Sequence, residues 1–388
     1  MRRVYLDNNA TTPVLPEVFE AMRPFYLEKF GNASSIHHYG QHARAAVEKA
    51  RASVAALLNA RPAEIIFTSG GTEADNLGIF GLVARGEHVI TSTIEHSAVT
   101  NTCKRLEQMG CEVTYVPVND RCLVDPDDVR RALRPNTKLI SVMMANNETG
   151  VVEPVEEIGK IAQEADVFFH TDAIQAAGKV PVDVQKIGCD ALSVSGHKIH
   201  APQGTGALFL KKGTLIQPLI YGGSHERQRR AGTENLPGIV GLGKAAQIAR
   251  DWLASDGPAE MSAMRDRLQD SVLNAMDGLG VNGLGAPRVP NTTNLYFDHI
   301  EGEALVIALD LKGLAVSSGA ACSSGAIEPS HVLLAMGLAH QRARASIRVS
   351  LGKQTTAEDV DFAISVIPET VGRLREISPL YRKQAVSQ

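Results

Sequence analysis

The first two-thirds of the chain alternate between helix-like and strand-like patterns of apolar residues. Apolar residues recur at three- and four-residue steps over 43–58, which predicts one buried helix face that ends before Pro62. Further helices are predicted after Gly71, after Glu95 and from Asp125, where a cap residue, a proline and acidic residues follow one another. Buried strands are predicted at six short apolar runs, residues 65–67, 89–90, 113–116, 139–144, 167–169 and 191–194. This alternation predicts an α/β fold with a mainly parallel sheet covered by helices on both faces.

The last third of the chain has a different pattern. Asp256-Gly257-Pro258 interrupts the chain after a helical pattern, and the segment beyond it predicts a smaller α+β domain. Its predicted elements are a long helix, a strand at 295–297, a helix over 303–311, a strand at 347–349 and a closing helix from about Thr356. We therefore predict a large domain over residues 14–254 and a small domain formed by residues 1–13 and 255–388.

Composition and charge narrow the class of protein. Hydrophobic residues make up 44% of the 388 residues and charged residues 21%, which argues against a disordered chain or a coiled coil. The net charge of −4 gives no sign of direct nucleic-acid binding. No apolar stretch is long enough to predict a membrane span, and the amino terminus lacks an apolar signal core. We expect a cytoplasmic protein.

Cysteine usage points to a reducing compartment. The five cysteines are odd in number and form no CxxC pair, so we expect neither a disulfide framework nor a permanent metal site. We expect Cys103, Cys111 and Cys189 to be buried and inert, and Cys122, in a polar turn, to be exposed. In chain order, the five cysteines are Cys103, Cys111, Cys122, Cys189 and Cys322.

Two residues at the ends of predicted strands, Lys198 and Asp172, carry functional groups that suit one and the same cofactor. Lys198 follows the strand at 191–194 in the sequence Ser195-Gly196-His197-Lys198, where open α/β sheets bind ligands. Its amine can form a Schiff base with an aldehyde cofactor, although most lysines are simply solvated. Asp172, after the strand at 167–169, can keep a pyridine nitrogen protonated, or it can be a helix N-cap. The two together favour the cofactor interpretation.

Two weaker signals lie upstream. The turn Ser69-Gly70-Gly71-Thr72-Glu73 joins a strand to a helix, and N–H groups at a helix start attract phosphate. This turn matches neither a Walker A loop nor a GxGxxG loop. His96 follows another strand and can stack on a ring or move a proton, although a capping or core histidine is the commoner case.

Two residues in the small domain are candidates for substrate chemistry. Cys322 lies in a Gly- and Ser-rich segment, residues 317–326, that we expect to be mobile, which suits a nucleophile that visits two places. Arg348 lies inside the apolar run at 347–349, where an arginine needs a partner. That partner is either a substrate carboxylate or an internal acid.

Taken in order, these motifs resemble the cysteine desulfurases of the NifS/IscS type, within the class-V aminotransferases of pyridoxal-phosphate fold type I. The resemblance runs nearly end to end and includes the Cys322 segment and Arg348. The matching stretches are residues 5–13, 31–37, 69–73, 95–96, 146–150, 170–175, 195–198, 230–235 and 327–331. It implies a large domain with a seven-stranded sheet and a smaller carboxyl-terminal domain that carries the cysteine.

The resemblance also implies roles for individual residues. Lys198 would carry pyridoxal 5′-phosphate as a Schiff base, Asp172 would contact its ring nitrogen, His96 would stack on the ring, and Gln175 would touch its phenolic oxygen. Arg348 and Asn147 would hold the substrate carboxylate, and Asn147 also lies beside the cofactor. The phosphate would be bound by Gly71, Thr72, Ser195, His197 and, from the partner subunit of a homodimer, Thr233.

The implied reaction converts L-cysteine to L-alanine and leaves the sulfur as a persulfide on Cys322, with Lys198 and His96 as the other catalytic residues. An acceptor such as an Fe–S scaffold, or a tRNA-thiolation carrier, would then take the sulfur. Cys322 could also ligate a cluster transiently. The alternatives are a selenocysteine lyase or other class-V enzyme, which needs no Cys322, and a sulfur- or cluster-carrying protein, which needs no Lys198.

Overall fold

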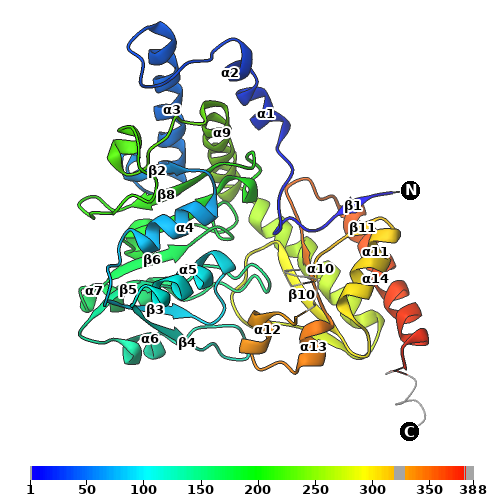
Figure 1. Cartoon of the computed structure of the whole chain (residues 1–388). Coiled ribbons are helices and arrows are strands. Elements are labelled where there is room, and N and C mark those ends of the chain that lie inside the picture. Colours follow the sequence, from blue (N-terminus) through cyan, green and yellow to red (C-terminus); the bar gives the residue numbers. More distant parts are fainter. Residues whose placement is uncertain (1, 319–327, 380, 382–388) are drawn as a thin grey trace.

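The computed structural model describes residues 2–318, 328–379 and 381 of the chain (Figure 1). Its centre is a seven-stranded sheet in the order β2-β8-β7-β6-β5-β3-β4, in which all neighbours are parallel except the two pairs made by β8. The α/β prediction is confirmed. The strands are β2 Ile65–Thr68, β3 His88–Ser92, β4 Glu112–Val116, β5 Thr137–Ser141, β6 Phe168–Asp172, β7 Ala191–Ser195 and β8 Gly206–Leu210.

These strands form because their side chains are buried on both faces of the sheet. Ile90, Ile140 and Phe169 lie in register on neighbouring strands and belong to one core cluster. Val89 and Leu139, one position earlier, belong to the core cluster on the opposite face. Such burial on two sides explains why the strands read as short continuous apolar runs. No strand is predicted from the sequence at β8, which pairs antiparallel with β2 and β7.

Helices cover both faces of the sheet (Figure 1). One core cluster collects side chains from α3, α6, α7, α8 and α9, and the other collects them from α4 and α5. The bounds on the first face are α3 His38–Leu57, α6 Pro126–Ala132, α7 Val155–Glu164, α8 Val184–Ile187 and α9 Leu236–Leu253. On the second they are α4 Gly71–Phe80 and α5 Ser97–Gln108. The helices α1 Pro16–Met22 and α2 Pro24–Leu27 precede them, and short 3-10 turns lie at Pro62–Glu64, Gly196–Lys198 and His225–Gln228.

A separate core organises the rest of the chain. It combines Val4 and Leu6 of the amino terminus with buried residues between 261 and 371, which supports the two-domain division that we propose from the sequence. Its strands are β1 Val4–Tyr5, β9 Leu279–Val281, β10 Thr292–Phe297, β11 Leu314–Ala315 and β12 Ser346–Ser350. Its helices are α10 Gly257–Ala275, α11 Gly302–Leu311, α12 His331–Ala335, α13 His340–Arg344 and α14 Ala357–Ile377.

One cysteine prediction is wrong. Cys122 is fully buried, not exposed, because its turn, which has a left-handed backbone at Cys122 (φ 68°), packs against Thr149, whose hydroxyl donates to the thiol at 3.5 Å. There it packs in a cluster with Ile94, Met143 and Val151. Cys103, Cys111 and Cys189 are buried, as expected.

Candidate active site

A cavity of about 320 Å³ opens where the carboxyl ends of the parallel strands meet the amino-terminal segment and β12. Its position follows from the topology, because strand ends on one edge of a parallel sheet bring distant residues together. Ten of the twelve residues singled out from the sequence line it; the exceptions are Cys322 and Thr233. The lining residues are Asn9, Ala10, Gly71, Thr72, Asp75, His96, Met143, Asn147, Asp172, Ile174, Gln175, Ser195, His197, Lys198 and Arg348.

Lys198 ends the 3-10 turn that follows β7, and its side chain enters the cavity. The Nζ atom donates hydrogen bonds to the backbone oxygens of Asn9, at 2.6 Å, and Ala10, at 2.7 Å. Burial lowers the pKa of Lys198 to about 8, and repulsion from Arg348 adds to this effect. A lysine with a lowered pKa keeps a useful neutral fraction near pH 7, and the neutral amine is the form that attacks a carbonyl.

Asp172 is the last residue of β6, and the chain continues from it into a turn and not into a helix, so Asp172 is not a helix N-cap. Its Oδ1 accepts a hydrogen bond from the backbone N–H of Ile174, at 2.8 Å, within this turn. Its carboxyl group also lines the cavity. Burial raises the pKa of Asp172 to about 6, while the N–H of Ile174 and the charge of Lys198 oppose the rise. A positively charged ring nitrogen in the cavity would favour the carboxylate further.

His96 caps α5. Its Nδ1 accepts a hydrogen bond from the backbone N–H of Ala98, at 3.1 Å, so the neutral ring carries its proton on Nε2. Burial, and then the charges of Lys198 and His331, lower its pKa. His96 is therefore a capping residue through its Nδ1 atom, and its ring also lines the cavity.

The start of α4 forms a cradle of the shape that a phosphate needs. A Cβ atom added to Gly71 would lie 2.3 Å from Cδ1 of Ile174 and 3.2 Å from Cβ of Ser195, so only glycine fits. Glu73, on the same first turn, accepts the backbone N–H of Ser69, at 2.7 Å. Arg230 then binds both carboxylate oxygens of Glu73, at 2.7 and 3.1 Å. The cradle is thereby tied to the segment that carries Thr233.

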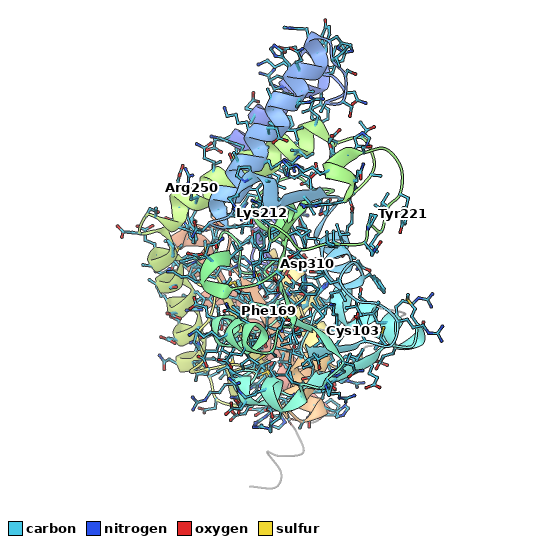
Figure 2. All side chains as sticks on the ribbon, turned by 90° about the vertical axis from the view of Figure 1, so that its left-hand side faces the viewer. Cys103, Phe169, Lys212, Tyr221, Arg250 and Asp310 are labelled. Atoms are coloured by element: carbon cyan, nitrogen blue, oxygen red, sulfur yellow. The ribbon has the colours of Figure 1, made fainter. Side chains whose placement is uncertain are left out.

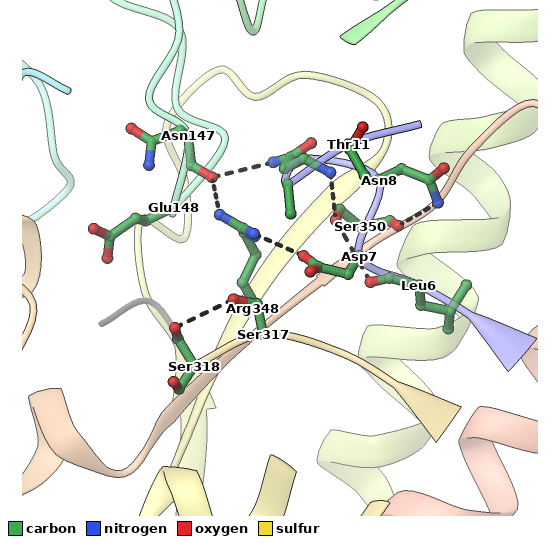
Figure 3. A network of polar contacts seen from close by, with 12 residues as sticks. Leu6, Asp7, Asn8, Thr11, Asn147, Glu148, Ser317, Ser318, Arg348 and Ser350 are labelled. Carbon is green, nitrogen blue, oxygen red and sulfur yellow. Dashed lines mark hydrogen bonds and ion pairs between the residues drawn. The ribbon is translucent and has the colours of Figure 1, made fainter. Parts of the chain in front are cut away.

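Arg348 has an internal partner in the structure (Figure 3). Its NH2 group pairs with Oδ1 of Asp7, at 2.7 Å, and its NH1 group donates to the backbone oxygen of Asn147, at 2.9 Å. The partner of Arg348 in the structure is therefore an internal acid, but one N–H donor of its guanidinium group remains unused. Among the described residues, Nε of Arg348 and Oδ1 of Asn147 are buried polar atoms without a hydrogen-bond partner.

Cys322 lies outside the described residues, but both flanks of its segment contact the site. On the amino-terminal side, the backbones of Ser317 and Arg348 exchange hydrogen bonds of 3.2 and 2.6 Å. On the carboxyl-terminal side, Ser330 donates to Oε2 of Glu148, at 2.5 Å. The ring Nε2 of His331 lies 3.0 Å from the backbone oxygen of Glu95.

Thr233 is exposed and lies apart from the cavity of its own chain. The fold also buries charged residues at the site that are not among those singled out from the sequence. Asp75, on α4, lines the cavity, and burial together with the nearby Asp172 holds its pKa well above the usual range. Lys179 is buried behind Gln175. In the sequence, Lys179 is a charge among apolar or small neighbours, whereas Asp75 lies close to other polar residues and gives no such signal.

The residues present fit pyridoxal phosphate. Lys198 and Asp172 lie at the carboxyl ends of neighbouring parallel strands and line one cavity, which therefore offers an amine for a Schiff base and a carboxylate for a ring nitrogen. Gly71 and Thr72 bring the start of α4 to the cavity wall, where helix N–H groups attract a phosphate, and His96 offers a ring.

Comparison with known proteins agrees with this chemistry. The model of the family described as aminotransferase class-V matches residues 4–362. A curated relative, "Cysteine desulfurase IscS" of Dictyoglomus turgidum, is 48% identical over all of this chain and 99% of its own length. A solved "NIFS-LIKE PROTEIN" is 38% identical with a TM-score of 0.89, covering 96% of this chain and 100% of its own. The structure "SspA in complex with cysteine" is 37% identical with a TM-score of 0.80, covering 90% of this chain and 98% of its own.

The fold and site thus define a pyridoxal-phosphate enzyme of fold type I. The chain belongs to the aminotransferase class-V family and, within it, to the cysteine desulfurases. In the part of the chain that the structure describes, no helix is both long and apolar enough to cross a membrane.

Glu148 makes the site sensitive to pH. Burial raises the pKa of Glu148 to about 7, against the opposing effects of Ser330 and Arg348. Between its ordinary pKa and 7, the folded apoprotein holds a proton that the unfolded chain releases, so the free energy of unfolding falls as pH rises through this window. We predict that Glu148→Gln removes part of this fall, on the order of 2 kcal/mol, between about pH 5 and pH 8.

Urea unfolding of the two apoproteins across this range measures the effect. Glu17→Gln, on the exposed side of α1, is the matched control and should leave the pH profile of the wild type unchanged. Parallel profiles for wild type and Glu148→Gln would show that Glu148 does not take up a proton in this window.

Proposed function

We propose that this protein is a cysteine desulfurase that uses Lys198 as its cofactor-bearing base and Cys322 as its sulfur acceptor. The observation that carries the proposal is the placement of Lys198, with its lowered pKa, in one cavity with Asp172 and Arg348. This cavity offers an amine, an acid for a ring nitrogen and a cation for a carboxylate. The cysteine bound to a related structure supports L-cysteine as the substrate here.

Substrate binding uses the donors that the internal contacts leave free. The unpartnered Nε of Arg348 and the side chain of Asn147 both line the cavity, where a substrate carboxylate would accept from the Nε–H of Arg348 and from the amide N–H of Asn147. Asp7 holds the arginine in place from its far side. The carboxylate then orients the α-carbon toward Lys198.

Pyridoxal phosphate, when bound, supplies an electron sink for charge that develops on the substrate. The Nζ atom of Lys198, freed when the substrate amine takes its place, removes the α-proton. Asp172 stabilises positive charge at the ring nitrogen, and the Nε2 proton of His96 is available to the substrate sulfur. Burial shifts the pKa values of Lys198 and Asp172 toward neutrality, to about 8 and about 6, and it lowers the pKa of His96.

The sulfur transfer balances without an external oxidant. The Cys322 thiolate attacks the substrate sulfur, the bond between that sulfur and the substrate β-carbon breaks, and the carbon takes up a proton. One L-cysteine and one thiol become one L-alanine and one persulfide. The persulfide then passes to an acceptor, for which we propose an Fe–S scaffold protein, or a tRNA-thiolation carrier, in the cytoplasm.

We also propose a homodimer. Large apolar side chains are exposed on α1–α3, at the projecting end of the molecule, and on the nearby segment that includes Tyr221 (Figures 1 and 2). Exposed groups of large apolar side chains are typical of protein interfaces. Thr233 is exposed and linked through Arg230 to the cradle, which suits a hydroxyl offered to a partner's phosphate site. The exposed residues are Phe19, Tyr26, Leu27, Phe30, Ile36, Tyr39, Leu215, Leu219, Ile220 and Tyr221.

Product analysis tests the reaction. With L-cysteine and a reductant, the wild type should release sulfide and alanine in equal amounts. Lys198→Ala should lose activity by 10³-fold or more, since both the cofactor bond and the base are lost. Cys322→Ala should stop sulfide release while it keeps the visible absorption band of the bound cofactor. Full turnover by Cys322→Ala would favour the selenocysteine lyase or another class-V reaction.

Mixed dimers test the role of Thr233. In a dimer of one Lys198→Ala chain and one Thr233→Val chain, the surviving Lys198 site receives an intact Thr233 from its partner. We therefore expect half of the wild-type activity and normal cofactor affinity at that site. When both changes are in one chain, the surviving site should bind cofactor about 10- to 100-fold more weakly, because one hydrogen bond to a charged phosphate is missing. The reverse pattern would place Thr233 in its own chain's site.

A further inference from the structure

Lys179 is a buried cationic residue that the proposed reaction does not use. It follows the turn after β6, and only 7% of its surface is exposed. Its Nζ atom donates to Oδ1 of Asn9, at 2.9 Å, and to Oε1 of Gln175, at 2.6 Å. Among the described residues it forms no ion pair with a carboxylate. Burying a lysine this deeply costs free energy, and a functional role would explain why it lies behind the cavity.

The contacts with Asn9 and Lys179 together fix which way the Gln175 amide faces. The backbone oxygen of Asn9 can only accept a hydrogen bond, so the amide nitrogen turns toward it and the amide oxygen turns toward Nζ of Lys179. The amide nitrogen then faces the opposite way. One of its two N–H groups donates to the backbone oxygen of Asn9, at 2.9 Å. The second has no acceptor among the described residues, and Gln175 lines the cavity.

The same contacts connect Lys179 to the cofactor-bearing lysine. The backbone oxygen of Asn9 that accepts from Gln175 also accepts from Nζ of Lys198. Asn9 is itself held by the small domain, through its own bond to Thr292, at 2.9 Å, and one from Asn291, at 3.1 Å. Asn9 therefore holds the amide nitrogen of Gln175 and Lys179 holds its oxygen, and the two contacts together set the direction of the second N–H.

The electrostatic environment of Lys179 favours a neutral amine that acts as a hydrogen-bond donor. Burial, and then the positive charges of Lys198 and Arg348, hold the pKa of Lys179 well below its usual range. A neutral amine still offers the two N–H donors that the geometry uses, and it adds no charge beside Lys198. The groups that face it are the amides of Asn9 and Gln175, with Lys198 and Arg348 beyond them, and on another side His200 and Lys353.

We propose that Lys179 is a positioning residue that turns the N–H of Gln175 into the cavity, so that Gln175 donates a hydrogen bond to the phenolic oxygen of the bound cofactor. The proposal rests on the proposed function and adds a residue to it. A donor at the phenolic oxygen stabilises the oxygen anion without the help of the Schiff-base proton. It therefore lowers the pKa of the visible chromophore.

A pH titration of the visible absorption of the loaded protein tests this role. Lys179→Met removes the donor at similar length, frees the amide to rotate, and should raise the pKa of the chromophore by about one unit. Gln175→Met should raise it as well. The double variant should titrate like Gln175→Met alone, because both changes break the same contact. Lys186→Met, an exposed lysine on α8, is the matched control and should titrate like the wild type.

A purely structural lysine would give a different result. Lys179→Met would then lower the urea midpoint of the apoprotein and leave the chromophore pKa unchanged, which overturns the proposal. Additive shifts in the double variant would overturn it too. If Lys179→Met does not fold, Lys179→Ala removes the same donor and is judged by the same titration. Failure of the proposed function is separate, since a wild type that forms no alanine from L-cysteine would show it.

Discussion

Two backbone carbonyl oxygens, those of Asn9 and Ala10, hold the amine of Lys198 at the carboxyl edge of the sheet. They belong to a segment that follows β1, whose side chains pack in the core of the small domain. The side chain of Asn9 reaches Thr292 in that domain and receives Lys179 from the large one. The active site therefore exists only where this segment lies between the two cores. This explains how residues from both ends of the chain share one cavity.

Burial tunes the chemistry of this junction. It raises the pKa of Asp172 to about 6 and lowers that of Lys198 to about 8, so an acid and a base in one cavity titrate within reach of neutral pH. Groups in this range transfer protons at small free-energy cost, which is what proton removal from an amino acid requires. Glu148, behind Arg348, follows the same principle with a pKa of about 7.

The sequence predicted those parts of the fold and site that depend on local pattern. Parallel strands buried on both faces appear as apolar runs, and Lys198 and Asp172 stand at their ends. β8 was missed because its pairing with β2 and β7 depends on distant residues and reverses direction. Asp75 and Lys179 were missed because tertiary packing alone buries them. Cys122 was placed wrongly because its polar neighbours gave no sign of the left-handed turn.

The location of the transferred sulfur after one turnover tests the central claim most directly. The holoenzyme would receive one equivalent of L-cysteine without reductant, and its peptides would then be examined by mass spectrometry under conditions that preserve persulfides. We predict one added sulfur atom on the peptide that contains Cys322 and none on the other four cysteines, which are buried. The added mass should be absent from Lys198→Ala. Sulfur on another cysteine, or alanine formed with Cys322 unmodified and no sulfide released, would contradict the account.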